Sequence, residues 1–174
     1  ALDQDQRVLV VDTNNSRVQA FDGSGNLLYK FGSLGSGDGM LRSPYGIASY
    51  SGRIYVADTG NHRIQVFNST GGFLFKFGGF GTSDGKLSNP RGIYTDPTGN
   101  VYVADTYNHR IQAFNASGSF LFKFGSLCKM ATGQGCVDPD GGGPLKTGDG
   151  QFYQPSSITK LTNGNLVVSD TLNH

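Results

Sequence analysis

A tract of thirteen residues recurs along the chain at a nearly constant spacing. It reads YVADTGNHRIQVF at 55–67 and YVADTYNHRIQAF at 102–114, with related copies at 9–21 and 166–174. Its aspartate occurs four times, as Asp12, Asp58, Asp105 and Asp170. The spacings are 46, 47 and 65 residues, and a period in the forties is typical of propeller blades or of paired-helix repeats. The repeat therefore restricts the fold before any single motif is considered.

Alternation within each repeat distinguishes strands from helices. In the segment 53–58, Ile54 and Val56 alternate with Tyr55 and Ala57. Such runs last about five residues, are rich in β-branched and aromatic side chains, and are bounded by Gly, Asn, Asp and Pro. A helix would need a run of about ten residues without such breaks, so no helix is expected. Each repeat then supplies four short antiparallel strands, the content of a propeller blade. The alternative, a β-sandwich, would not repeat with this fidelity.

One repeat carries a family resemblance. The segment PRGIYTDPTGNVYVADTYNHRIQAFNASGSFLFKFG, residues 90–125, resembles an NHL repeat, which is named for a tripeptide of the Asn-His-Leu type. The tripeptide stands here as 61–63 and 108–110, both Asn-His-Arg, whereas the first copy departs with Asn-Ser-Arg at 15–17. The resemblance implies an all-β fold, a β-propeller of four-stranded antiparallel NHL-type blades.

The repeat divides the chain into units at 1–32, 33–78, 79–125 and 126–174, the last with a loop insertion at about 126–148. These units supply an expected thirteen strands, or about 3.25 blades, whereas propellers typically have about four to eight. We therefore expect the sequence to be an excerpt of a larger, six-bladed propeller. The alternative is a complete chain whose open blade edges pair with other copies.

Each tract places an aspartate five residues before an arginine, on opposite sides of a turn. The pairs are Asp12 with Arg17, Asp58 with Arg63, and Asp105 with Arg110. The carboxylate can meet the guanidinium of its own blade or of the next, and can accept N–H groups of the turn. Because catalytic groups occur once and not once per blade, these pairs are predicted to be structural clamps. The histidines of the tract, His62, His109 and His174, fall on different blades and are not expected to share a metal.

Residues that differ between repeats are the candidates for ligand binding. The residue inside each Pro-x-Gly or Pro-x-Ser motif starts an innermost strand, and it is Tyr45, Arg91 or Ser156. Tyr107 takes the variable place in the D-T-x-N-H turn on the same face. Because aromatic and arginine side chains are the usual anchors of recognition, Tyr45, Arg91 and Tyr107 are predicted ligand contacts. The alternative is ordinary surface variation.

The insertion holds both cysteines. Cys128 and Cys136 are predicted to form a disulfide, which indicates an oxidising compartment, with two unpaired thiols as the alternative. The segment 138–149 partly matches a calcium loop but lacks its final glutamate and flanking helices. No cofactor is therefore expected, with calcium at Asp138 and Asp140 as the alternative.

Composition narrows the function. The net charge of +1 does not favour a large nucleic-acid footprint, and no apolar run reaches membrane-spanning length. No nucleophile or phosphate-cradling motif occurs. We therefore predict a non-enzymatic, secreted or extracytoplasmic scaffold, which binds a protein or glycan through the face of the D-T-x-N-H turns.

Three other functions stay open. The resemblance implies that the chain could belong to a metal-dependent propeller lyase or hydrolase, although its innermost strands supply only Asp96 as an acid. Open blade edges would suit a subunit of an extracellular assembly. Some animal NHL proteins bind RNA, to which Arg91, Lys129 and Lys160 would contribute here.

Overall fold

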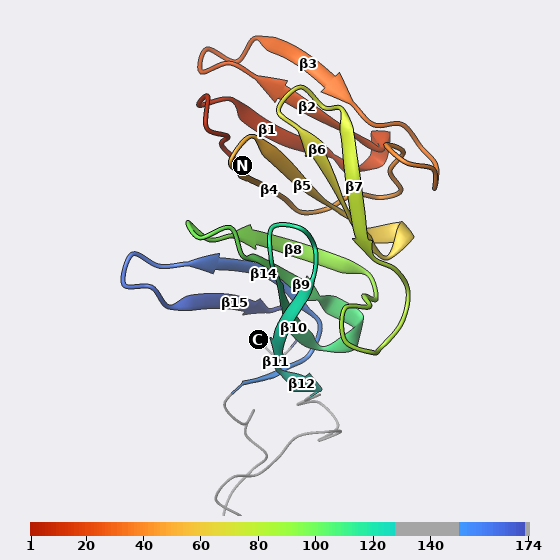
Figure 1. Ribbon diagram of the computed structural model, residues 1–174, viewed down its shortest axis with the longest axis vertical. Coiled ribbons are helices and arrows are strands. Elements are labelled where there is room, and N and C mark those ends of the chain that lie inside the picture. The colour runs from red at the N-terminus through yellow and green to blue at the C-terminus, as the bar shows by residue number, and fades with distance from the viewer. Residues whose placement is uncertain (128–149, 173–174) are drawn as a thin grey trace, which may run out of the picture.

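The computed structural model describes residues 1–127 and 150–172, and its sheets follow one another along the chain (Figure 1). The predicted disulfide of Cys128 and Cys136, the calcium alternative at Asp138 and Asp140, Lys129 and His174 lie outside the described residues. None of the helices in the described part is long and apolar enough to cross a membrane.

Four antiparallel sheets correspond to the four repeats. The first contains β1 (Val8–Asp12), β2 (Arg17–Phe21) and β3 (Leu27–Phe31). The second contains β4 (Ile47–Tyr50), β5 (Arg53–Asp58), β6 (Arg63–Asn68) and β7 (Phe73–Gly78). The third contains β8 (Pro90–Thr95), β9 (Val101–Asp105), β10 (Arg110–Phe114) and β11 (Phe120–Phe124). The last contains β14 (Pro155–Lys160) and β15 (Leu166–Asp170). The predicted all-β fold of four-stranded antiparallel blades is confirmed, and the described sheets do not close into a ring.

Two local features were not predicted. The D-T-x-N turns are short 3-10 helices, η1 (Thr13–Asn15), η2 (Thr59–Asn61) and η3 (Thr106–Asn108). In addition, β12 (Ser126–Leu127) pairs in parallel with β13 (Gln151–Phe152). Single parallel bridges, Leu34 with Leu41 and Phe80 with Leu87, take the equivalent place in the earlier links. The two ends of each link therefore pair with each other in parallel. This pairing involves only one or two residues on each side, which is too few to produce an alternating pattern in the sequence.

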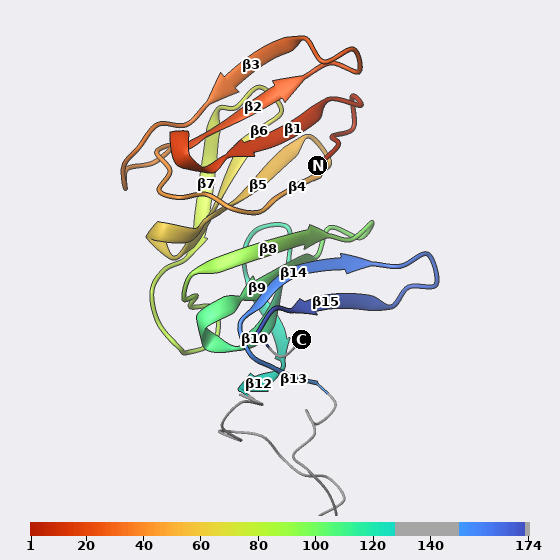
Figure 2. The same cartoon turned by 180° about the vertical axis from the view of Figure 1, so that it is seen from behind.

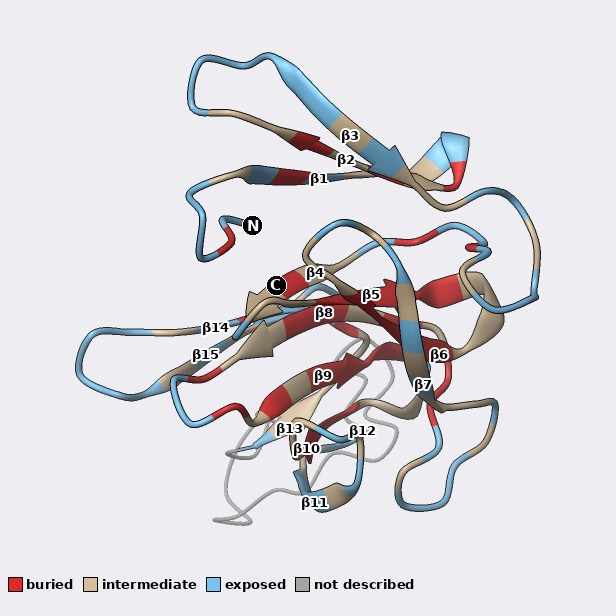
Figure 3. Ribbon diagram, turned by 45° about the horizontal axis from the view of Figure 1, so that its top comes forward, coloured by how far each residue is buried: buried red, intermediate tan, exposed pale blue. Residues whose placement is uncertain are grey.

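The second strand of the second blade, β5, is buried on both faces. Ile54 and Val56 of β5 pack in a cluster with Leu9 and Leu41, towards the first blade. Tyr55 and Ala57 of the same strand pack in a second cluster, towards the third blade. Figure 3 shows the central strands buried along most of their length. In β5 the two alternating faces therefore pack in two different cores, because the second blade has a neighbouring blade on each side.

The glycine of the Pro-x-Gly motif allows the innermost strands to approach one another. A Cβ atom at Gly46 would lie 2.1 Å from the carbonyl oxygen of Arg91, on the next blade. A Cβ atom at Gly92 would lie 2.7 Å from the Cα of Ser157, on the blade after that. The Thr95 hydroxyl joins the same strands by donating to the Ser49 carbonyl at 3.0 Å. These contacts fix how the blades fan around their common axis.

We expect Gly46→Ala to destabilise the fold by about 1–3 kcal/mol, because its methyl group meets the backbone of β8, which cannot move aside cheaply. Gly23→Ala is the matched control, since a Cβ atom there has nothing within 4 Å. Urea denaturation of both variants and the parent measures the difference. Equal stabilities of the two variants would show that β4 and β8 are not in close contact.

Candidate binding face

The turn of the second blade is tied to the link that precedes it. Asp58 lies at the end of β5, and its carboxylate accepts hydrogen bonds from Arg63 Nε at 2.7 Å and from the Arg42 backbone N–H at 2.7 Å. Gln65 Nε2 also donates to it at 3.0 Å. Arg63 Nη2 then donates to the carbonyls of Gly37 and Met40, at 2.8 and 3.1 Å. The carboxylate thus pairs with the guanidinium of its own blade, and both side chains hold the link from the blade before.

The third blade repeats this network. Asp105 accepts from Arg110 Nε at 2.7 Å and from the Ser88 backbone N–H at 2.6 Å. Arg110 Nη2 donates to the carbonyls of Ser83 and Lys86, at 2.9 and 3.0 Å. In the first blade, Arg17 Nε lies 2.7 Å from Asp12, but no preceding link covers this pair within the described residues. The side chains of Asp12 and Arg17 are consequently 21% and 32% exposed, whereas that of Asp105 is fully buried.

The same turn is also tied forward, to the blade that follows. The Thr59 hydroxyl donates to the Pro90 carbonyl at 2.6 Å, and Thr106 donates to Pro155 at 2.8 Å. The histidines act as acceptors, because His62 Nδ1 receives the backbone N–H of Asn89 at 3.1 Å. The equivalent bond runs to His109 Nδ1 from the Gln154 N–H, also at 3.1 Å. The D-T-x-N-H tract is therefore a joint in both directions.

The environment of His109 favours its neutral form. Burial lowers the pKa of His109, and the charges of Asp170 and Asp105 only partly oppose this. The ring also stacks on Tyr153, with centroids 5.4 Å apart. Protonation of Nδ1 would remove the acceptor of the Gln154 N–H. Within residues 1–127 and 150–172, no three His, Cys, Asp or Glu side chains gather as a metal site would require.

The structure brings together two of the three predicted ligand contacts. Arg91 Cζ lies 5.4 Å from the ring centroid of Tyr45, the geometry of a cation–π pair, and Tyr45 is 55% exposed. Tyr107 lies on η3 and is also exposed, but no ring or hydrogen-bond contact joins it to that pair. Ser156, the third residue of this series, shares a hydrogen bond with Thr171.

Exposed apolar residues of the links were missed from the sequence. Phe80 and Leu34 are 74% and 68% exposed, and they occupy equivalent places in successive links. The ring of Phe80 lies 4.9 Å from that of His62, so it sits on the joint itself. The signal was present as an apolar residue two positions after Gly32 and Gly78, where a surface link usually carries polar residues.

Asp96, the acid at the end of an innermost strand, is part of a turn. Its carboxylate accepts the backbone N–H groups of Thr98 and Asn100, each at 2.9 Å, and the Thr98 hydroxyl at 2.6 Å. Burial acts to raise the pKa of Asp96, but these hydrogen bonds outweigh it and the pKa is lowered. A general acid at neutral pH needs the opposite shift, so this environment fits a turn cap better than a proton donor.

Stacked four-stranded sheets with joints repeated once per blade define a β-propeller. Comparison with known families then places the chain within that class. The NHL repeat matches residues 41–67 and 87–114, which confirms the predicted resemblance over these parts of the second and third blades. No curated protein matches the sequence.

Solved propellers with different descriptions share this fold. Streptogramin B lyase matches with a TM-score of 0.66 at 17% identity, over 98% of this chain and 46% of its own. Virginiamycin B lyase from Staphylococcus aureus matches equally well, over 99% and 48%. An auxiliary nutrient binding protein from Bacteroides ovatus gives 0.64 at 16% identity, over 98% and 44%. The chain thus spans less than half the length of these structures, and at such identities the likeness shows the fold alone.

We expect Asp105→Asn to lower the free energy of unfolding by about 3 kcal/mol, because the buried guanidinium of Arg110 loses its counter-charge. Asp12→Asn makes the same chemical change at the exposed copy and should have a much smaller effect. Urea denaturation of both variants gives the comparison. A similar loss at both positions would mean that wrapping by the preceding link does not strengthen the joint.

We expect stability to fall as the pH drops below about 6.5, the usual pKa of histidine, since the unfolded chain then binds a proton that folded His109 resists. Above that pH the contribution is fully present. His109→Asn keeps an acceptor near the Nδ1 position and tolerates the left-handed backbone, so its stability should vary less with pH. Urea titrations at about pH 7.5 and about pH 5.5 test this. An unchanged slope in the variant would contradict it.

Proposed function

We propose that this chain forms part of a non-enzymatic, extracytoplasmic binding scaffold that acts through the face of the links and D-T-x-N-H turns. One observation carries the proposal. The repeated polar residues of the tract are engaged in joints, whereas the variable positions and the links expose large apolar and aromatic side chains among polar ones. The exposed side chains are Leu34, Met40, Tyr45, Phe80 and Tyr107, and the half-buried Arg91 stacks on Tyr45.

The chemistry of this face suits a protein partner. Interface cores are enriched in aromatic residues, methionine and arginine and are depleted of unpaired charge. Here both aspartates of the links are paired, Asp38 with Lys76 and Asp84 with Lys123. Arg91 remains available through its stacking on Tyr45. An exposed aromatic ring beside an arginine would equally suit a glycan, which the experiment below separates from a protein.

The similar structures support a binding role and an extracytoplasmic place without deciding either. They include auxiliary nutrient binding proteins of Bacteroides and a putative exported protein of Bacteroides fragilis. The lyases among them share the fold at 17% identity. In the described residues, the acid at an innermost strand end is already engaged in a turn, so the lyase alternative gains no support from this site.

The test places a photo-crosslinking amino acid at Phe80, on the proposed face, in the extracytoplasmic fraction of the source cells. Leu27 is the control position, since it is also apolar and exposed but lies on β3, beside the hairpin at the other end of its blade. We expect a defined partner to be linked from position 80 and not from position 27. Mass spectrometry then distinguishes a protein from a glycan.

Binding of the purified partner gives the decisive measurement. Tyr45→Ala combined with Arg91→Ala should weaken it by about tenfold or more, since such residues act as anchors. Leu27→Ala should leave it unchanged. The proposal is wrong if the double variant binds as tightly as the parent, or if the purified protein turns over a substrate.

A further inference from the structure

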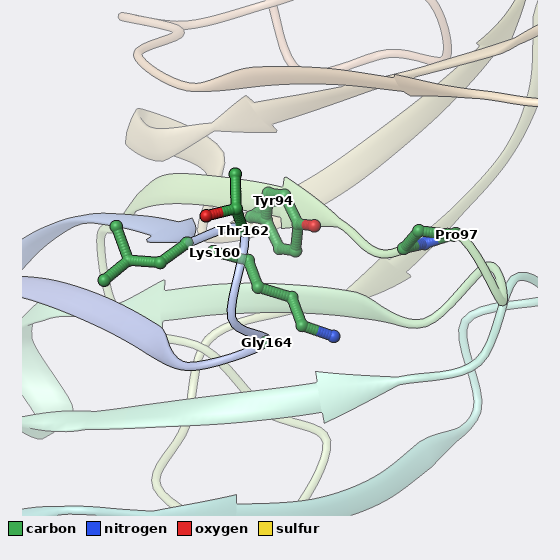
Figure 4. Close-up of a pocket in the computed structure, with 6 residues that line it drawn as sticks. Tyr94, Pro97, Lys160, Thr162 and Gly164 are labelled. Atoms are coloured by element: carbon green, nitrogen blue, oxygen red, sulfur yellow. The ribbon is translucent and has the colours of Figure 1, made fainter.

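A pocket of about 340 Å³ lies at the other end of the blades (Figure 4). It is lined by Tyr94, Pro97, Lys160, Leu161, Thr162 and Gly164. Tyr94 comes near the end of β8, and Lys160 ends β14. Both strands start at the links, so the pocket lies away from Tyr45 and Arg91. Figures 1 and 2 show the hairpins after β8 and β14 on the side opposite the η turns.

From this pocket we propose a second binding site, which takes a small organic monocarboxylate with an apolar or single-ring body. Its argument does not depend on the partner proposed above, because the two sites share no residue. The pocket joins two blades, the third through β8 and the fourth through β14, and contacts between blades are common places for small ligands.

The walls of the pocket would hold the body of such a ligand. Pro97, Leu161 and the ring of Tyr94 present apolar surface, and Gly164 adds no side chain. Tyr94 packs against Tyr102 with ring centroids 6.1 Å apart, which fixes the orientation of the phenol. The volume is near the lower end of that of ligand pockets, about 300–1,000 Å³, so one ring or a short aliphatic chain fits.

Within the part of the chain that the structure describes, the polar side chains of the pocket are donors without partners. Lys76 and Lys123 pair with aspartates, whereas Lys160 makes no ion pair with any described residue. The hydroxyls of Tyr94 and Thr162 likewise make no hydrogen bond within the described part of the chain. In Figure 4 the Tyr94 hydroxyl and the Lys160 amino group both lie on the side of Pro97. The Thr162 hydroxyl points the other way in Figure 4, so the Lys160 ammonium and the Tyr94 hydroxyl are the two donors that can share one carboxylate.

The carboxylate of Asp96, next to the pocket, limits the negative charge that the ligand can carry. Burial and the charge of Asp96 raise the pKa of Tyr94, so the phenol stays a protonated donor at neutral pH. The Asp96 carboxylate is occupied by Thr98 and Asn100, and the Tyr102 hydroxyl also donates to it at 3.3 Å. It therefore does not neutralise Lys160 by a direct ion pair. Its negative charge disfavours a second carboxylate, which is why the site should select a monoanion.

The test is calorimetric or NMR titration of the whole chain with benzoate and galacturonate, beside the neutral benzamide and the dianion phthalate. We expect benzoate to bind, and benzamide and phthalate to bind about tenfold more weakly. Shifts of the Leu161 and Gly164 backbone amides in NMR spectra would locate the ligand. Comparing benzoate with galacturonate separates an aromatic acid from a sugar acid as the source of the carboxylate.

Variants assign the effect to the pocket. Lys160→Met should reduce benzoate affinity about tenfold or more, and Tyr94→Phe should reduce it less. Lys30→Met is the matched control, since Lys30 lies on β3 and makes no ion pair in the described chain. Circular dichroism verifies that each variant is folded. The proposal is overturned if no monocarboxylate binds below about 10 mM, if benzamide binds as well as benzoate, or if Lys160→Met binds like the parent.

Discussion

The buried pairing of an aspartate with an arginine at the end of the second strand, in the second and third blades, is the interaction on which the rest of the structure depends. Asp58 and Asp105 each hold an arginine, a glutamine and a backbone N–H of the preceding link. Because a buried charge without its partner is costly, the link must stay wrapped over the pair. The threonine and histidine of the same turn then fix the following blade, so one short tract orders three consecutive parts of the chain.

This arrangement divides the molecule into two ends with different properties. At the joint end, the polar residues are satisfied internally, and apolar residues of the links, such as Phe80 and Leu34, are left in solvent. At the hairpin end, Asp96 and Asn68 cap tight turns by accepting backbone N–H groups. The repeat itself serves stability at both ends, and the proposed binding therefore rests on residues that differ from blade to blade.

The sequence was sufficient to predict the strands of a single blade, but not how neighbouring blades cover it. Strand boundaries, the antiparallel order and the tract's pairing could be predicted, because periods of two within a strand and of about 47 between blades reflect local geometry. The double burial of β5 could not, since Tyr55 and Ala57 look like an exposed face until a third blade covers them. The parallel pairing within the links and the apolar residues above the joints were missed for the same reason.

The sequence by itself determined a β-propeller of NHL repeats and the identity of the joint residues. The reason is that each blade needs the same hydrogen bonds at its joint, so the residues that make them recur in every repeat. Only the tertiary structure decided which variable residues meet. Tyr45 and Arg91 are 46 residues apart, yet they stack because glycines allow β4 and β8 to touch. Tyr94 and Lys160 come together for a similar reason, as the ends of adjacent innermost strands. The spacing of residues along the chain reflects the contacts within one blade. A site between blades depends on how closely those blades pack, which the spacing does not show.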